Sequence, residues 1–78
     1  MKAATKRFMK IMNDLFSAYV KDGKMDNYRI EENIFYISDK EDATYMWAAL
    51  DGAVHLFNSL NGATLSLGVS GDNIVIEE

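Results

Sequence analysis

The chain contains no cysteine and no proline, and it has one histidine among 78 residues. Without cysteine it has no disulfide framework, no thiolate metal site and no cysteine nucleophile, which predicts a reducing, cytoplasmic setting. The lack of proline, with 49% apolar and 12% aromatic residues, argues against a disordered chain. We expect one folded domain over residues 1–78, because a chain of this length is too short for two cores.

Long apolar runs are missing as well. Nowhere do about 18 apolar residues follow one another, the length that a membrane-spanning helix needs. The basic start of the chain reaches Asn13 and Asp14 before any apolar run of signal-peptide length. The sequence therefore predicts neither a membrane span nor a secretory leader.

The net charge of −4 combines 12 acidic with 8 basic residues. We expect no direct nucleic-acid binding, because nucleic-acid-binding domains usually carry a basic face. Four basic residues fall within the first ten positions: Lys2, Lys6, Arg7 and Lys10. The sequence predicts a positive N-terminal end against a negative remainder, and we interpret the lysines as the solvated face of a core helix.

Two helices are predicted from apolar residues that recur every three or four positions. The first runs from about Ala3 to Asp22, where a glycine follows. The second begins after Ser38, because a serine followed three residues later by Glu41 forms a capping box, and it ends near Leu60. Each apolar face covers about half of the circumference, so we expect each helix to contact both a sheet and the other helix.

Four strands are predicted as two hairpins, with turns at Glu32-Asn33 and at Ser70–Asn73. The order α-β-β-α-β-β predicts a two-layer α+β domain, a four-stranded sheet with both helices packed on one face. Helices on opposite faces are the alternative. The polar side of the third strand, with Thr64 and Ser66, disfavours a second buried layer.

Two strands, Ile34–Ile37 and Ile74–Ile76, are apolar on both sides, whereas a strand with one solvated side should alternate. We take as the inward set Phe35, Ile37, Ile74 and Ile76. The predicted partner-binding residues are then Ile34, Tyr36, Val75 and Arg29. An exposed apolar patch commonly marks a contact surface, here for a second copy in a homodimer or for another protein. Scattered exposed apolar residues without a function are the alternative.

Catalytic and metal-binding patterns are scarce. His55 follows Asp51 by four residues and precedes Asn58 by three, so all three can share a helix face. An Asp–His pair can orient an imidazole as a general base, but no nucleophile accompanies it, and we predict no enzyme. With one histidine and no cysteine we expect no zinc site, and the acids at positions 39–42 lack EF-hand spacing. We predict no metal and no cofactor.

The sequence thus predicts a small acidic, non-enzymatic protein-binding protein, such as an inhibitor or adaptor on a larger cytoplasmic assembly. An acidic inhibitor can compete for a basic groove through electrostatic complementarity. The candidate acidic surface comprises Asp22, Asp26, Glu31, Glu32, Asp39, Glu41, Asp42 and Asp72. A merely solubilising role for these acids is one alternative. A ligand-sensing or enzymatic domain that uses the Asp51/His55 face is the other.

Overall fold

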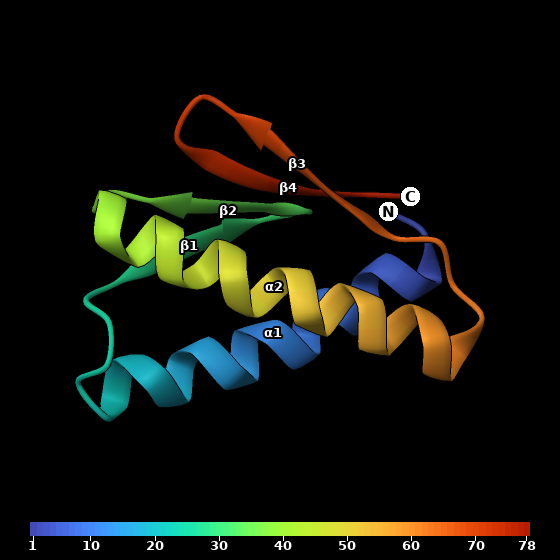
Figure 1. Cartoon of the computed structure of the whole chain (residues 1–78), viewed down its shortest axis with the longest axis horizontal. Coiled ribbons are helices and arrows are strands. Elements are labelled where there is room, and N and C mark those ends of the chain that lie inside the picture. Colours follow the sequence, from blue (N-terminus) through green and yellow to red (C-terminus); the bar gives the residue numbers. More distant parts are fainter.

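The computed structural model describes all residues from Met1 to Glu78. Its elements are α1 (Ala3–Lys21), β1 (Tyr28–Glu31), β2 (Ile34–Ile37), α2 (Lys40–Asn61), β3 (Ser66–Ser70) and β4 (Asn73–Glu77). The strands form one antiparallel sheet in the order β1-β2-β4-β3. The two helices run side by side beneath the sheet (Figure 1). The predicted α+β fold, its element order and the placement of both helices on one face are confirmed.

The start of α2 differs from the prediction by one residue. The N-cap is Asp39 and not Ser38, because Asp39 has the extended backbone of a cap residue (φ −111°, ψ 130°). Its Oδ1 accepts hydrogen bonds from the backbone N–H of Glu41 at 2.7 Å and of Asp42 at 3.4 Å. A carboxylate at this position also favours the positive end of the helix dipole. At the other end, Gly62 closes the helix in the left-handed conformation (φ +61°).

The core lies between the sheet and the helices. The four predicted inward residues of β2 and β4 are all buried: Phe35, Ile37, Ile74 and Ile76. Phe16 of α1 is fully buried, and its ring meets those of Tyr28 and Phe35 edge-on at centroid distances of 6.0 and 5.8 Å. Such aromatic pairs contribute about 0.5–1.5 kcal/mol each beyond the burial of apolar area. Phe16 therefore fixes α1 against both β1 and β2.

The helices also contact each other, as their wide apolar faces predict. Phe8 of α1 and Phe57 of α2 pack edge to face with their ring centroids 5.3 Å apart. At the other end of the helix pair, Tyr19 and Tyr45 pack in the same way at 5.8 Å.

Neither helix is both long enough and apolar enough to cross a membrane.

A pair of hydrogen bonds joins the two hairpins near the first turn. The backbone N–H of Ile76 donates to the carbonyl of Asn33 at 2.9 Å, and the Asn33 side chain donates to the carbonyl of Ile76 at 2.8 Å. Further along, Ile34 pairs with Val75. These contacts place β4 in the middle of the sheet and leave β1 and β3 as its two edges.

Candidate functional site

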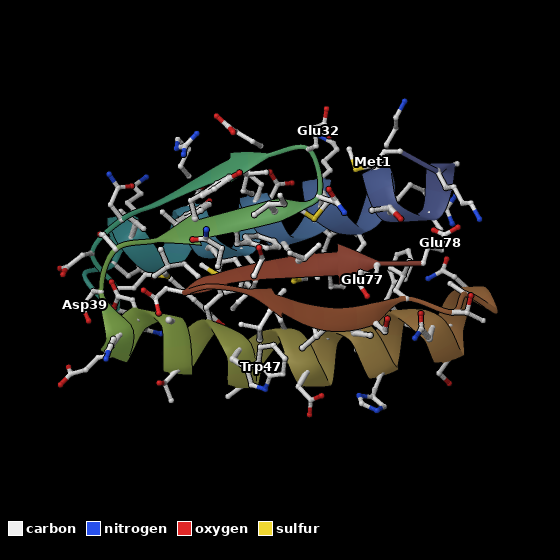
Figure 2. All side chains as sticks on the ribbon, turned by 90° about the horizontal axis from the view of Figure 1, so that it is seen from above. Met1, Glu32, Asp39, Trp47, Glu77 and Glu78 are labelled. Atoms are coloured by element: carbon white, nitrogen blue, oxygen red, sulfur yellow. The ribbon has the colours of Figure 1, made fainter.

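The open face of the sheet carries all four predicted partner-binding residues. Figure 2 looks down on this face, with the strands in front of both helices. Ile34 and Val75 are neighbours across β2 and β4, and Tyr36 lies two residues along β2. All three side chains are half-buried. Arg29 is the cross-strand neighbour of Tyr36, and its guanidinium lies over the Tyr36 ring, 4.2 Å from the centroid.

Charged groups of both signs border this apolar centre. Arg29 is hydrogen-bonded to Glu31 two residues along β1. On the β3 side, the carboxylate of Glu77 lies over Gly68, where an added Cβ would come within 3.0 Å of its Oε1. The row of residues from Glu31 through Ile34 and Val75 to Gly68 thus crosses all four strands. We call this surface the open sheet face.

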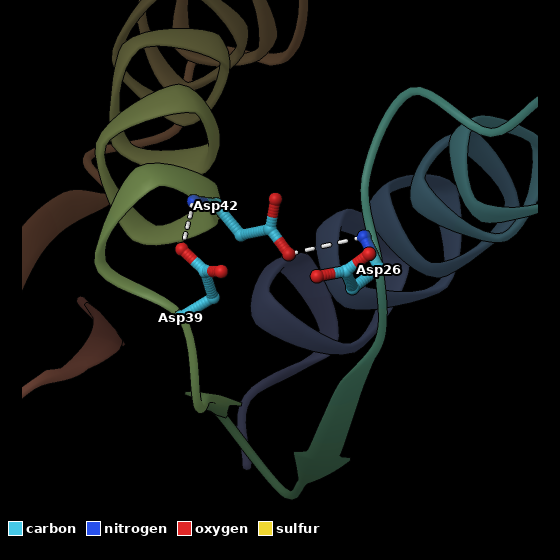
Figure 3. A group of neighbouring side chains, drawn as sticks. All are labelled: Asp26, Asp39 and Asp42. Atoms are coloured by element: carbon cyan, nitrogen blue, oxygen red, sulfur yellow. Dashed lines mark hydrogen bonds between the residues drawn. The ribbon is translucent and has the colours of Figure 1, made fainter.

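Three of the predicted acidic residues come together at one end of the molecule (Figure 3). Carboxylate oxygens of Asp26, Asp39 and Asp42 lie within 4.8 Å of one another. Asp39 caps α2, and Asp42 Oδ2 accepts a hydrogen bond from the backbone N–H of Asp26 at 3.0 Å. Calcium in proteins takes six to eight oxygen ligands, so three carboxylates can supply only part of such a set, with water or backbone carbonyls as the remainder. The cluster fastens the loop before β1 to the start of α2.

The other predicted acids divide between the two ends. Asp22, Glu41 and Asp72 lie at the same end as the cluster, where α1 ends, α2 begins and the β3–β4 hairpin turns (Figure 1). We call these six acids the acidic end, and the basic residues beside them are Lys21, Lys24 and Lys40. Glu31 is the last residue of β1, and Glu32 begins the first hairpin turn. Glu32 lies at the opposite end of the molecule, near Met1 (Figure 2).

Acidic residues from the C-terminal end of the chain and from the first hairpin turn balance the predicted positive N-terminal end. Lys2 Nζ lies 3.8 Å from Glu78 Oε2, and the hydroxyl of Thr5 donates to Glu78 Oε1 at 2.8 Å. Glu77 and Glu32 lie at the same end of the molecule (Figure 2). The excess negative charge is therefore concentrated at the acidic end. The sequence did not predict this concentration of charge at one end. It depends on how the fold brings together acidic residues that are distant along the chain.

The Asp51/His55 pair is exposed on α2. His55 Nδ1 lies 2.7 Å from the carbonyl oxygen of Asp51 and 3.8 Å from its carboxylate. The His55 side chain is 79% exposed and open to solvent. Asn58 does not join the pair, because its side-chain amide binds the backbone of Leu65. This face offers no enclosed position in which a substrate would meet the imidazole.

A groove that the sequence did not reveal lies between the first half of α2 and the β3–β4 hairpin. It has a volume of about 360 Å³ and includes the side chains of Ile37 and Ile74. At its mouth Trp47 is 37% exposed and Val69 is 65% exposed. We call it the α2/hairpin groove. Trp47 is the only tryptophan, but its position in the sequence does not show that Val69 of the second hairpin lines the same groove.

The helices also bury less than their apolar faces predicted. Ile11, Leu56 and Leu60 are exposed, and Leu60 reaches 75% exposure. Neither the sheet nor the neighbouring helix covers these side chains. The expectation that the two contacts account for both apolar faces is therefore wrong for these residues.

Comparison of the chain with protein-family models, with curated proteins and with solved structures finds no match.

Proposed function

We propose that this protein is a non-enzymatic binding protein that forms a homodimer through its open sheet face. One observation supports the proposal: Ile34, Tyr36 and Val75 form an apolar centre on a sheet face that no other element covers. Removing apolar area from water contributes roughly 25 cal/mol per Å² before the costs of association are subtracted. A small domain such as this one buries only part of its apolar surface in its own core. Burial against a second copy therefore adds a larger share of stability than it would in a large domain.

The charges around the apolar centre favour a second copy as the occupant. A twofold axis brings the same patch of both copies together, so the patch must be complementary to itself. The open sheet face is suited to this arrangement, because Arg29, which pairs with Glu31, stands on one side of the centre and Glu77 stands on the other. A twofold can place the cation of one copy near the carboxylate of its partner, which favours one orientation over others.

The biological role that we propose for this dimer is that of an inhibitor or adaptor within a larger cytoplasmic assembly. A dimer joined by its sheet faces leaves both acidic ends free. Each acidic end carries six carboxylates and three lysines, so it is suited to a basic surface on a partner protein, where complementary charge speeds association.

Sedimentation over a wide concentration range tests the homodimer. We expect the wild type to form a dimer and Tyr36→Lys to give a folded monomer, because a lysine at the patch centre would have to lose its hydration on association. Ser59→Lys is the matched control, since it adds the same charge at an exposed position of α2, and it should leave the dimer intact. A wild type that stays monomeric at all concentrations would refute the homodimer.

The alternative function, a ligand-sensing or enzymatic domain at the Asp51/His55 face, has one supporting contact. The hydrogen bond from Nδ1 to the Asp51 carbonyl fixes the imidazole and leaves Nε2 free. The high exposure of both side chains argues against it. A change of activity or ligand binding in His55→Ala, with unchanged stability, would favour this alternative over the binding protein.

A further inference from the structure

Strand β3 forms an edge of the sheet and lacks the residues that usually protect an edge. Its five residues, Ser66–Ser70, include no charged residue and no proline, the residues with which proteins commonly prevent pairing with another chain. The other edge, β1, carries Arg29 and Glu31. The β3 edge is therefore the one to which an extended segment can add as a fifth strand.

The free backbone groups of this edge belong to Leu67 and Val69. Ile76 of β4 donates its backbone N–H to Asn33, on the β2 side. The direction of the hydrogen bonds alternates along an antiparallel strand. Leu67 is the cross-strand partner of Ile76, so the N–H and carbonyl of Leu67 point away from β4, and those of Val69 do the same. An added strand finds two donors and two acceptors here.

The α2/hairpin groove lies directly beside this edge. Val69 pairs with the buried Ile74, so its side chain is on the helix side of the sheet, where it shares the groove with Trp47. Every second side chain of an added strand would point to the same side. Apolar side chains at those positions would cover Val69 and Trp47, which are otherwise exposed.

The charge around the groove identifies the kind of partner. Asp39 and Asp72 border the groove, with Lys40 as the only basic residue there. Asp51 follows Trp47 by one helical turn on the same side of α2. An extended segment with a lysine or arginine complements these three carboxylates, whereas an acidic segment is repelled.

A second copy of the chain is disfavoured at this edge by the same charges. α2 runs antiparallel to β3, with Asn58 beside Leu65 and Trp47 in the groove with Val69. Two β3 strands paired about Gly68 would therefore bring the Asp51 regions of two α2 helices side by side. Like charges facing each other across an interface are unfavourable.

We propose that β3 and the α2/hairpin groove bind an extended segment of another protein, with apolar residues at alternate positions and a lysine or arginine at its end. This binding mode uses a surface separate from the open sheet face. It does not depend on the homodimer, and each of the two proposals can fail alone.

Fluorescence of Trp47, the only tryptophan, reports on the groove in the unmodified protein. The probes are two capped peptides, Lys-Val-Thr-Val-Thr-Val-Lys and its counterpart with glutamate in place of both lysines. We expect the basic peptide to shift the emission saturably to shorter wavelength and the acidic peptide to bind at least about tenfold more weakly. The basic peptide with N-methyl groups on alternate backbone nitrogens should also bind about tenfold more weakly, because it lacks the donors that pair with β3.

Two variants locate the binding. Val69→Lys introduces a cation into the groove and should weaken binding of the basic peptide at least about tenfold, whereas Leu60→Lys makes the same change on the far side of α2 and should not. The proposal is overturned if the basic peptide gives no saturable response, or if the acidic or N-methylated peptide binds equally well. It is overturned too if Val69→Lys dissociates a dimer that Tyr36→Lys leaves intact, since a second copy then occupies the edge. Should Val69→Lys not fold, the peptide comparison on the wild type decides alone.

Discussion

The side-chain amide of Asn58 binds both backbone groups of Leu65. Its Nδ2 donates to the Leu65 carbonyl at 2.8 Å, and its Oδ1 accepts from the Leu65 N–H at 2.9 Å. The amide acts as a strand would, because it satisfies one donor and one acceptor of the segment that enters β3. The buried Leu65 side chain is thereby held against the core, and α2 is fixed to the start of the second hairpin.

Replacement of Asn58 tests this link. Asn58→Ala removes both hydrogen bonds and should lower the free energy of unfolding by about 1–3 kcal/mol, the cost of leaving partly buried backbone groups unpaired. Asn58→Asp keeps the acceptor but sets a carboxylate oxygen against the Leu65 carbonyl in place of the donor, so at neutral pH it should also be less stable than the wild type. Urea unfolding followed by circular dichroism measures both. Equal stability of all three proteins would show that water replaces the amide without loss.

The cap of α2 provides a second prediction. Asp39→Ala should destabilise the fold by about 1 kcal/mol, because two amides of the first turn lose their acceptor. Ser38→Ala is the matched control, since Ser38 makes no side-chain hydrogen bond to the helix, and its effect should stay within about 0.5 kcal/mol. The reverse ranking, measured by thermal or urea unfolding, would restore Ser38 as the cap.

The basic N-terminal residues give a third prediction. Of the four, Lys2 alone forms an ion pair, at 3.8 Å with Glu78, and the Lys2 side chain is mostly exposed. Replacing Lys2, Lys6, Arg7 and Lys10 by glutamine should therefore leave the fold intact and change the free energy of unfolding by about 1 kcal/mol or less. The loss should diminish in 0.5 M NaCl, because salt screens the added repulsion. A variant that unfolds would show that these exposed side chains support the core, for example through Arg7, whose guanidinium lies over the Phe57 ring.

Local sequence patterns predicted the helices and strands well. They did not determine which residues of different elements contact one another. The spacing of Phe8, Met12 and Leu15 and the glycine at position 62 placed both helices within about a residue of their observed bounds. The inward side taken for Phe35 was also correct, although a strand that is apolar on both sides does not itself indicate which side is buried. These features depend on contacts between residues close in sequence, whose geometry is set by the period of the element.

The candidate sites depend on contacts between distant residues, and the sequence predicted them less completely. Asn58 does follow His55 by three residues on α2. Its side chain, however, accepts a hydrogen bond from the backbone N–H of Leu65 in the following loop and does not join the Asp51/His55 pair. Trp47 and Val69 meet only because β3 turns back over α2. Neither outcome follows from periodicity, because each requires the path of the chain after Gly62.

The uneven placement of charge has a consequence for how the molecule turns as it approaches a partner. The longest dimension is 33 Å, several times the screening length of about 10 Å in 0.1 M salt. The acidic end therefore interacts with an external field almost independently of the neutralised end near Met1. A positively charged surface exerts a torque on the molecule, which rotates the acidic end and the mouth of the α2/hairpin groove towards that surface before any atoms touch.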